Sequence, residues 1–330
     1  MEMIRKIKAK LPTKDDILRV YKKSPIKLVD LFVWGMLLLM AFVFLYPFIH
    51  MITTSFKSYS DLLNVTIKWL PKNPTLENYA VALKVMRLGD TLPNSLIVTI
   101  LTTVGHVFVC SFIAYGFSRF DFPLKGTLFG IVILSILVPI QTIIIPMYTT
   151  YANLSFSVGE YTFKMLGTYW PLIFPCFLGY GLKGGLFIFL YRQYFLGIPK
   201  ALEEAATIDG CGPVKTFFKI AFPSAGSTTI VCIVLSMVWH WNDYYEPSLY
   251  LNEYDQMLLP QIVASLKALV TEMQRTMIDG SGSTTMSDIL YHEGTVMAGT
   301  FFSMVPPMAG YLILQRRFME GIEHSGLTGM

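Results

Sequence analysis

Long runs without a charged residue alternate with short charged segments along most of the 330 residues. Five of these runs, and a sixth that only Lys183 interrupts, reach the roughly 20 residues that a membrane-spanning helix needs. The pattern therefore predicts an all-α membrane protein with six transmembrane helices. Their approximate bounds are 31–53, 93–117, 126–150, 167–191, 221–242 and 295–315.

The charged residues between the runs predict the orientation, because cytoplasmic segments of membrane proteins carry an excess of Lys and Arg. About two thirds of the 26 Lys and Arg residues fall on the side of the membrane that holds both termini. We therefore expect cytoplasmic termini, with a basic tail over residues 1–30 that contacts anionic lipid and a short tail over 324–330. The segment 198–223 is then cytoplasmic, and residues 243–293 form an outer loop.

The segment 198–223 predicts two short helices joined by a bend. Pro199 suits the first turn of a helix, the Leu, Glu and Ala residues that follow favour helix, and Gly210 suits the position just past its end. Beyond the bend, apolar residues recur at the spacing of an amphipathic helix, at Val214, Phe217, Phe218 and Ala221.

The first of these two helices carries features of a docking surface. Ala205 and Ala206 give it a face without bulk, and Asp209 lies at its C-terminal end, where a negative charge is disfavoured and needs a partner. The residues alone leave two interpretations open. One is a solvated helix that links two spans, and the other is an element that binds another protein.

Six of seven positions at fixed spacing in this segment resemble the EAA loop of the permease subunits of ATP-binding-cassette (ABC) importers. The family consensus is Glu-Ala-Ala, three residues, Gly, nine residues, Ile, one residue, Leu and Pro. Only Phe222, in place of Leu, departs from it. Residues 74–79, ahead of the second span, and Trp241-Asn242 resemble the smaller permease of maltose-type carbohydrate importers.

The resemblance implies a type I ABC importer permease fold that works with partners. These are a second permease in a heterodimer, a dimer of ATPases that binds the ATP, and an extracytoplasmic solute-binding protein, so the chain itself holds no cofactor. The cargo implied is a carbohydrate, and more narrowly an oligosaccharide. The EAA loop (residues 198–223) is implied to couple the spans to the ATPase through Glu204, Ala205, Ala206, Asp209, Gly210, Ile220 and Pro223.

Composition and motifs exclude several other classes. With 53% hydrophobic and 15% charged residues, against about 25% charged in soluble domains, the chain belongs in a cell membrane, and its net charge of +4 gives no argument for nucleic acid. No phosphate-binding G-x-x-x-x-G-K-[ST] loop and no hydrolase motif occurs, so we expect no enzymatic activity and no catalytic residues. The cysteines lack ligand spacing, which predicts neither a metal site nor disulfides; they are Cys110, Cys176, Cys211 and Cys232.

Two polar residues within the spans are candidates for the transport pathway, Gln141 and Lys183. Pro139 and Pro146 bracket Gln141 and predict a kink in the third span. Lys183 is placed inside the bilayer, where a charge usually faces a cavity or a partner. Snorkelling of Lys183, or a fourth helix that begins later, stays open.

Other polar and small residues in the spans are assigned structural roles. Gly181 and Gly185 have the spacing that lets helices pack closely. His106 and His240 have no companions at ligand spacing, which predicts two separate structural histidines.

The outer loop 243–293 carries eight acidic and two basic residues. Within it the residues 279–283 predict a flexible tip, and an amphipathic stripe is formed by Ile262, Leu266, Leu269, Val270 and Met273. Two interpretations stay open for the loop: contact with a solute-binding protein, or a passive stripe on the bilayer surface.

Three other functions remain open at the level of the sequence. An ion-coupled secondary carrier would need paired ionisable groups near the midplane, and Lys183 has no acidic partner in any span. Besides this carrier, the sequence leaves open an ABC importer for a solute other than sugar. It also leaves open a membrane scaffold that recruits a soluble protein through the EAA loop.

Overall fold

The computed structural model describes residues 27–158, 161–181, 183–251, 253–281 and 293–327. Residues 1–26 and 328–330 of the predicted tails, and residues 282–292 of the outer loop, lie outside the described residues. The chain divides into two compact units, residues 1–53 and 54–330, which are described separately.

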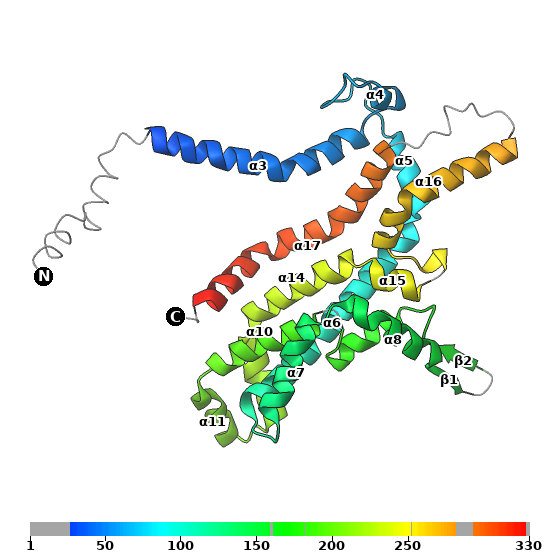
Figure 1. The fold of residues 1–330 in the computed structure, drawn as a ribbon. Helices are drawn as coiled ribbons and strands as arrows, with labels where there is room; N and C mark the ends of the chain where they lie inside the picture. The colour runs from blue at the N-terminus through cyan, green and yellow to red at the C-terminus, as the bar shows by residue number, and fades with distance from the viewer. Residues whose placement is uncertain (1–26, 159–160, 182, 252, 282–292, 328–330) are drawn as a thin grey trace, which may run out of the picture. The chain divides into compact units, whose positions relative to one another are not determined.

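Helices account for nearly all of the regular structure (Figure 1). In the first half of the chain they are α3 (Lys27–Ser55), α4 (Tyr59–Leu63), α5 (Glu77–Met86), α6 (Leu88–Arg119), α7 (Lys125–Leu137) and α8 (Ile140–Asn153). In the second half they are α9 (Trp170–Ile173), η1 (Phe174–Leu178), α10 (Gly184–Gly197), α11 (Lys200–Ile208), α12 (Pro213–Thr216), η2 (Phe217–Ala221), α13 (Phe222–Ser224), α14 (Gly226–Asn242), α15 (Tyr245–Tyr250), η3 (Tyr254–Gln256), α16 (Leu259–Ser281) and α17 (Glu293–Leu327).

A short antiparallel hairpin follows α8. Its strands are β1 (Ser155–Val158) and β2 (Tyr161–Lys164), paired with Ser155 opposite Lys164. Residues 155–158 lie beyond the predicted end of the third span at residue 150, and the sequence did not predict these strands. The hairpin is a local addition to a fold that is otherwise helical in the described residues.

The first unit consists of most of α3, which is apolar on all sides. Over Val29–Ser55 the helix is long and apolar enough to cross a membrane, as the sequence predicts for the first span. Because the apolar residues show no single favoured face, the helix suits a lipid environment better than a water-facing surface.

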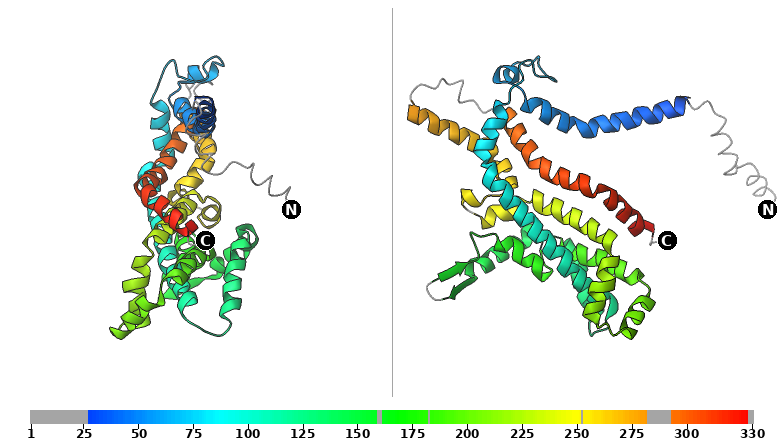
Figure 2. Two further views of the ribbon diagram at one scale, coloured as in Figure 1. Left: turned by 90° about the vertical axis from the view of Figure 1, so that its left-hand side faces the viewer. Right: turned by 180° about the vertical axis from the view of Figure 1, so that it is seen from behind.

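The core of the second unit forms around α6, which packs against α10, α14 and η1. Figures 1 and 2 show α6, α10 and α14 side by side. Aromatic side chains fill the space between them: Tyr115 of α6 meets the ring of Phe195 of α10 edge to face, with the ring centroids 5.7 Å apart. The largest buried side chains of this cluster are Phe187, Tyr191, Phe195 and Phe217.

The third predicted span is broken, not merely kinked. Helices α7 and α8 meet at an angle of 103° at Val138-Pro139. The residue before a proline is biased to extended backbone, and Val138 adopts it with φ −73° and ψ 117°. Pro139 then precedes the first residue of α8, while Pro146 lies inside α8. The expected interruption of the helix at Pro139 is confirmed, but it is a bend of 103° and not the kink within one helix that the sequence predicts.

The fourth predicted span is also discontinuous. The backbone turns between η1 and α10 through positive φ values at Gly179 (73°), Gly181 (127°) and Lys183 (64°). Lys183 therefore precedes the first residue of α10 and is not inside a continuous helix, which is the later start that the sequence left open. The close approach expected at Gly185 is present, because a Cβ there would lie 2.8 Å from the carbonyl oxygen of Val132 on α7.

The fifth predicted span bends by 78° at Ala225, between α13 and α14. Pro223 has no N–H group to continue the α-helical pattern. The preceding turn widens into a π-helix, in which the Phe222 N–H bonds to the Phe217 carbonyl five residues earlier. The two parts are long and apolar enough to cross a membrane only when they are taken together.

The amphipathic stripe of the outer loop is buried in protein. Helix α16 packs against α5 and α17. Its residues Ile262, Leu266 and Val270 are buried in a cluster with Met86 and Trp241. The interpretation of a stripe that rests on the bilayer surface is therefore wrong for these three residues. The side chain of Met273 lies outside the described part of the chain, and residues 279–281 of the predicted flexible tip continue α16.

Within the described residues, three helices, α3, α6 and α17, are individually long and apolar enough to cross a membrane, and the two bent pairs raise this number to five if each pair is one span. The structure is thus that of a helical membrane protein. The count of six spans and the cytoplasmic location of both termini stay predictions.

Candidate functional site

The first helix of the EAA loop has the ends that the sequence predicts. Helix α11 runs from Lys200 to Ile208, directly after Pro199, and Gly210 follows it with φ +77°. This left-handed conformation lets the N–H groups of Gly210 and Cys211 bond back to the carbonyls of Thr207 and Ala206, at 3.0 and 2.8 Å. A Cβ on Gly210 would meet no atom within 4 Å, so the requirement for glycine here comes from the backbone alone.

Helix α11 is fixed to the membrane-spanning part by Arg119. The guanidinium of this residue, at the end of α6, donates from Nε to Oε1 of Glu203 at 2.7 Å and from Nη2 to the carbonyl oxygen of Ile198 at 2.9 Å. The side chains of Arg119 and Glu203 are only 7% and 17% exposed, so the pair is largely withdrawn from water. The two bonds attach α11, through Glu203, and the residue Ile198 just before it to the end of α6.

The opposite face of α11 is exposed. Glu204, Ala205, Asp209 and Gly210 are all at the surface, whereas Ala206 is buried beneath them. Ile208 is 87% exposed, an unusual degree for a large apolar side chain on a short helix. An exposed apolar residue beside a carboxylate and a small side chain is typical of a surface that a partner covers.

The second half of the EAA loop is less regular than the sequence predicts. Phe217 and Ala221 are buried and Ile220 is half-buried, but Val214, Phe218 and Pro223 are exposed. The predicted amphipathic stripe is therefore split between an inward and an outward side. The π-helical turn over Phe217–Ala221 also takes the side chains after Thr216 out of the 3.6-residue period.

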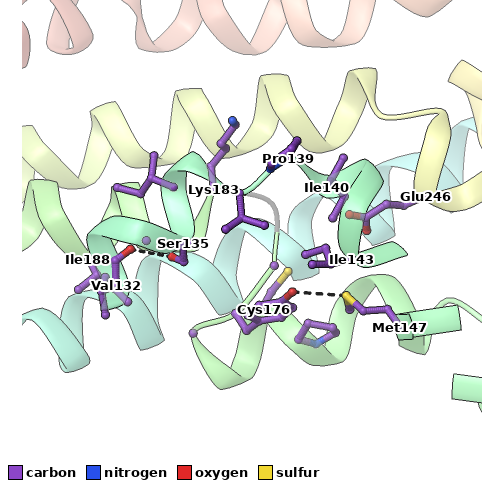
Figure 3. A pocket seen from close by; sticks show the side chains of 18 of the residues that line it. Val132, Ser135, Pro139, Ile140, Ile143, Met147, Cys176, Lys183, Ile188 and Glu246 are labelled. Atoms are coloured by element: carbon purple, nitrogen blue, oxygen red, sulfur yellow. Dashed lines mark hydrogen bonds between the residues drawn. The ribbon is translucent and has the colours of Figure 1, made fainter. Parts of the chain in front are cut away.

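The two candidate pathway residues line one cavity. It has a volume of about 560 Å³ and lies where the third and fourth predicted spans break, with Gln141 and Lys183 among its lining residues. In Figure 3 the Lys183 side chain extends away from Cys176. Gln141 and Lys183 lie at the same cavity because the chain breaks between α7 and α8 and between η1 and α10. The sequence predicted a kink at the first of these places, not a break at both.

An acidic residue that the sequence did not single out also faces this cavity. Glu246 of α15, beyond the end of α14, points into it (Figure 3). Burial, and after it the neighbouring Asp243, raises the pKa of Glu246 to about 8. A carboxyl group in this state exchanges its proton near neutral pH, so the charge of the cavity changes over that range.

The two histidines are not the separate residues that the sequence predicts. His240 Nε2 lies 3.1 Å from Nδ1 of His106, across a separation of 134 positions in the chain. Cys176 adjoins them, with Sγ 4.0 Å from His240 Nε2. Sequence spacing gave no signal for this contact, because three different segments supply the three side chains.

Comparison with known proteins identifies a family for most of the chain. Residues 106–318 match the family described as "Binding-protein-dependent transport system inner membrane component". The chain is 28% identical over 285 residues to the probable starch degradation products transport system permease protein AmyC of Thermoanaerobacterium thermosulfurigenes, covering 86% of this chain and 92% of the relative. It is 29% identical over 234 residues to the sn-glycerol-3-phosphate transport system permease protein UgpE of Shigella flexneri serotype 5b, covering 71% and 72%.

A solved structure shares the fold. A chain of a bacterial ABC transporter involved in the import of the acidic polysaccharide alginate superimposes with a TM-score of 0.71 at 18% sequence identity. The match covers 90% of this chain and 98% of the other. At this identity the likeness is evidence for the fold alone.

Proposed function

The chain belongs to the family of binding-protein-dependent transport system inner membrane components, and on this premise we propose that its cargo is a carbohydrate of oligosaccharide size. As a family member the chain is a multi-pass membrane subunit of an ABC importer, is not itself an enzyme, and works with an ATPase and a solute-binding protein. The secondary carrier and the scaffold are thereby excluded.

The observation that carries the proposed cargo is the likeness to AmyC over nearly the full length of both chains. The name of AmyC gives starch degradation products as the cargo of its system, and the segments around residues 74–79 and 241–242 resemble maltose-type permeases. A second candidate is an organic phosphate ester, since the name of UgpE gives sn-glycerol 3-phosphate, although the match covers less of each chain.

We propose that the EAA loop seats α11 on the ATPase. The exposed face of α11 supplies a carboxylate at Glu204, a small side chain at Ala205 and an apolar contact at Ile208, while the Arg119–Glu203 pair on the other side transmits force to α6. A rigid connection of this kind would convert movement of the ATPase into a rearrangement of the spans.

The remaining architecture is part of the same proposal. Six spans with both termini in the cytoplasm, a tail over residues 1–30 and an outer loop over 243–293 would place the EAA loop and the outer loop on opposite sides of the membrane. The exposed apolar side chains of α6 would then face lipid or a second permease in a heterodimer; they include Ile97, Ile100, Leu101 and Val104.

The decisive experiment identifies the cargo and the coupling together. The cognate solute-binding protein is purified, its bound ligand is identified by mass spectrometry, and uptake of that ligand is measured in proteoliposomes that contain the complete transporter and ATP. We expect a bound oligosaccharide and uptake that the Glu204→Lys variant lacks. A bound phosphate ester would refute the carbohydrate and favour the second candidate.

A further inference from the structure

A cluster of two imidazoles and a thiol lies in the core of the second unit. It comprises His106 of α6, Cys176 of η1 and His240 of α14. One ligand atom of each residue lies within 4.8 Å of the others; the histidine nitrogens are 3.1 Å apart, and Cys176 Sγ is 4.0 Å from His240 Nε2. His106 and Cys176 are 0% and 1% exposed.

Most polar atoms of the cluster have a partner, since the Cys176 thiol donates to the carbonyl oxygen of Leu172 at 3.4 Å and the two histidines bond to each other, but one does not. Nε2 of His106 is buried and has no hydrogen-bond partner among the described residues. The backbone of Gly181 closes over that side of the cluster, since a Cβ there would lie 3.2 Å from His106 Nε2 and 3.4 Å from Cys176 Sγ. Burying a polar group without a partner is costly, so the environment of His106 is unusual for a structural histidine, and the separations of the three donor side chains are what indicate a ligand.

The donor set is that of a thiophilic transition metal. Zinc binds Cys sulfur at about 2.3 Å and His nitrogen at about 2.0–2.1 Å, so ligand atoms around one ion lie roughly 3–4 Å apart. The separations of 3.1 and 4.0 Å fall in this range. Imidazole and thiolate together favour zinc or copper(I) over magnesium or calcium, which prefer oxygen.

We propose that His106, Cys176 and His240 bind one thiophilic metal ion, of the zinc or copper(I) class. The Cys176 thiol loses its proton to solvent when the ion binds, because the thiolate is the ligand. The ion joins three separate segments, α6, η1 and α14, and so fixes η1, just before the break between η1 and α10, to its two neighbours. This proposal does not depend on the identity of the cargo.

The cavity of about 560 Å³ supplies a way in for the ion. Cys176 and His240 both line it, whereas His106 does not, so the cluster is reached from the cavity at two of its three ligands. Three protein ligands leave a fourth position open, as in catalytic zinc sites. Because two of the three ligands line the cavity, a solvent molecule or a cavity group such as Glu246 could reach that position from it.

The test uses Co²⁺ as a spectroscopic probe on the purified transporter complex in detergent. Cobalt bound by a thiolate in tetrahedral geometry gives a sulfur-to-metal charge-transfer band and visible d–d bands, and Zn²⁺ should displace it with loss of both. Cys176→Ser should abolish the charge-transfer band. The matched control is Cys211→Ser, which removes a cysteine of the EAA loop far from the cluster in the chain and should leave the spectrum unchanged.

A second variant keeps the test valid where Cys176→Ser disturbs assembly. His240→Gln retains the thiol and removes one imidazole, so the affinity for Co²⁺ should fall by more than the roughly 10- to 100-fold that loss of an outer-shell partner costs. Elution of each variant on size exclusion confirms assembly. The absence of a charge-transfer band in the unaltered complex, or the same band in Cys176→Ser or the same affinity in His240→Gln, would overturn the proposal.

Discussion

Arg119 and Glu203 form a largely buried ion pair, 2.7 Å from Nε to Oε1, between the last residue of α6 and the helix of the EAA loop. Residue 203 directly precedes the Glu204 of the motif, so the two carboxylates point in different directions from α11. Glu203 is held inward by Arg119, while Glu204 is exposed. Glu203 anchors α11 to Arg119, and this leaves the exposed Glu204 available to a partner.

Replacing Arg119 by Leu should loosen α11 without touching its exposed face. Removing a charged partner leaves Glu203 unpaired and costs about 1.5–3 kcal/mol of stability. We expect a lower Tm of the purified chain and ATP hydrolysis that solute-loaded binding protein no longer stimulates. Arg119→Lys should not restore function, because a single ammonium cannot reproduce the bonds to both Glu203 and Ile198.

The double variant Arg119→Leu/Glu203→Leu serves as the control for this pair. It removes both charges, so no carboxylate is left buried and the combined loss should be smaller than the sum of the two single losses. Additive losses, or full coupling in Arg119→Leu, would contradict the anchoring role.

Glu204→Lys should abolish transport while the protein remains in the membrane. If the exposed carboxylate meets a basic residue of the ATPase, a lysine at this position places like charges at a desolvated contact, which costs several kcal/mol. The measurement is co-purification of the ATPase together with uptake. Glu253→Lys reverses the charge of an exposed glutamate outside the EAA loop and should leave co-purification of the ATPase intact. Unreduced co-purification in Glu204→Lys would rule out docking through this residue.

Gly210→Val should damage coupling through the backbone alone. The φ of +77° is strongly unfavourable for a β-branched residue, by roughly 1–2 kcal/mol or more, although no neighbouring atom would clash with the side chain. Gly210→Asn should be milder, because Asn tolerates the left-handed region. Gly212→Ala is the matched control, since Gly212 has an ordinary φ of −71° and open space around it. Stimulated ATP hydrolysis at the normal rate in Gly210→Val would contradict a role for the shape of this turn.

The sequence predicts local features well where their causes are local. The start of α11 after Pro199, the left-handed Gly210 and the irregularity at Pro139 all follow from residue chemistry within a few positions. The size of a bend is different, because a proline fixes where a helix is interrupted but tertiary packing decides whether the two parts turn by 20° or by 103°.

Features that depend on distant segments could not be predicted. The amphipathic stripe of α16 was identified, but an apolar face is compatible both with lipid and with protein, and only the packing against α5 and α17 decides. The contact between His106 and His240 and the anchoring of Glu203 by Arg119 join residues 134 and 84 positions apart, with no spacing rule to reveal them.

The stability of the chain should fall as the pH rises toward 8, because of Glu246. Its pKa is raised from 4.5 to about 8 in the folded protein, so between these values the folded state holds a proton that the unfolded state has lost. Folding is then opposed increasingly as pH rises, by up to about 1.4 kcal/mol for each pH unit in this window. Glu246→Gln, which keeps the side chain neutral, should flatten the dependence of Tm on pH between about 5 and 8. Glu253→Gln is the control, and an equal slope in Glu246→Gln and the unaltered chain would contradict the assignment.

Helix α16 is where we expect contact with the solute-binding protein. The apolar stripe of α16 is buried in the core with Met86 and Trp241, so packing against protein holds the helix in place. The opposite face of α16 is exposed. A firmly held helix on the proposed outer side transmits a contact more directly than a stripe lying on lipid would.

Deletion of residues 279–283 tests this contact, since it removes the last turn of α16 and the two residues after it while leaving Ile262, Leu266 and Val270 in place. Stimulation of ATP hydrolysis by liganded binding protein should be lost, and basal hydrolysis retained. Leu266→Ala is the comparison, because removing a fully buried leucine costs about 2–5 kcal/mol and should lower stability and basal activity together. If the deletion leaves stimulation intact, the outer loop is passive and the binding protein must engage another part of the transporter.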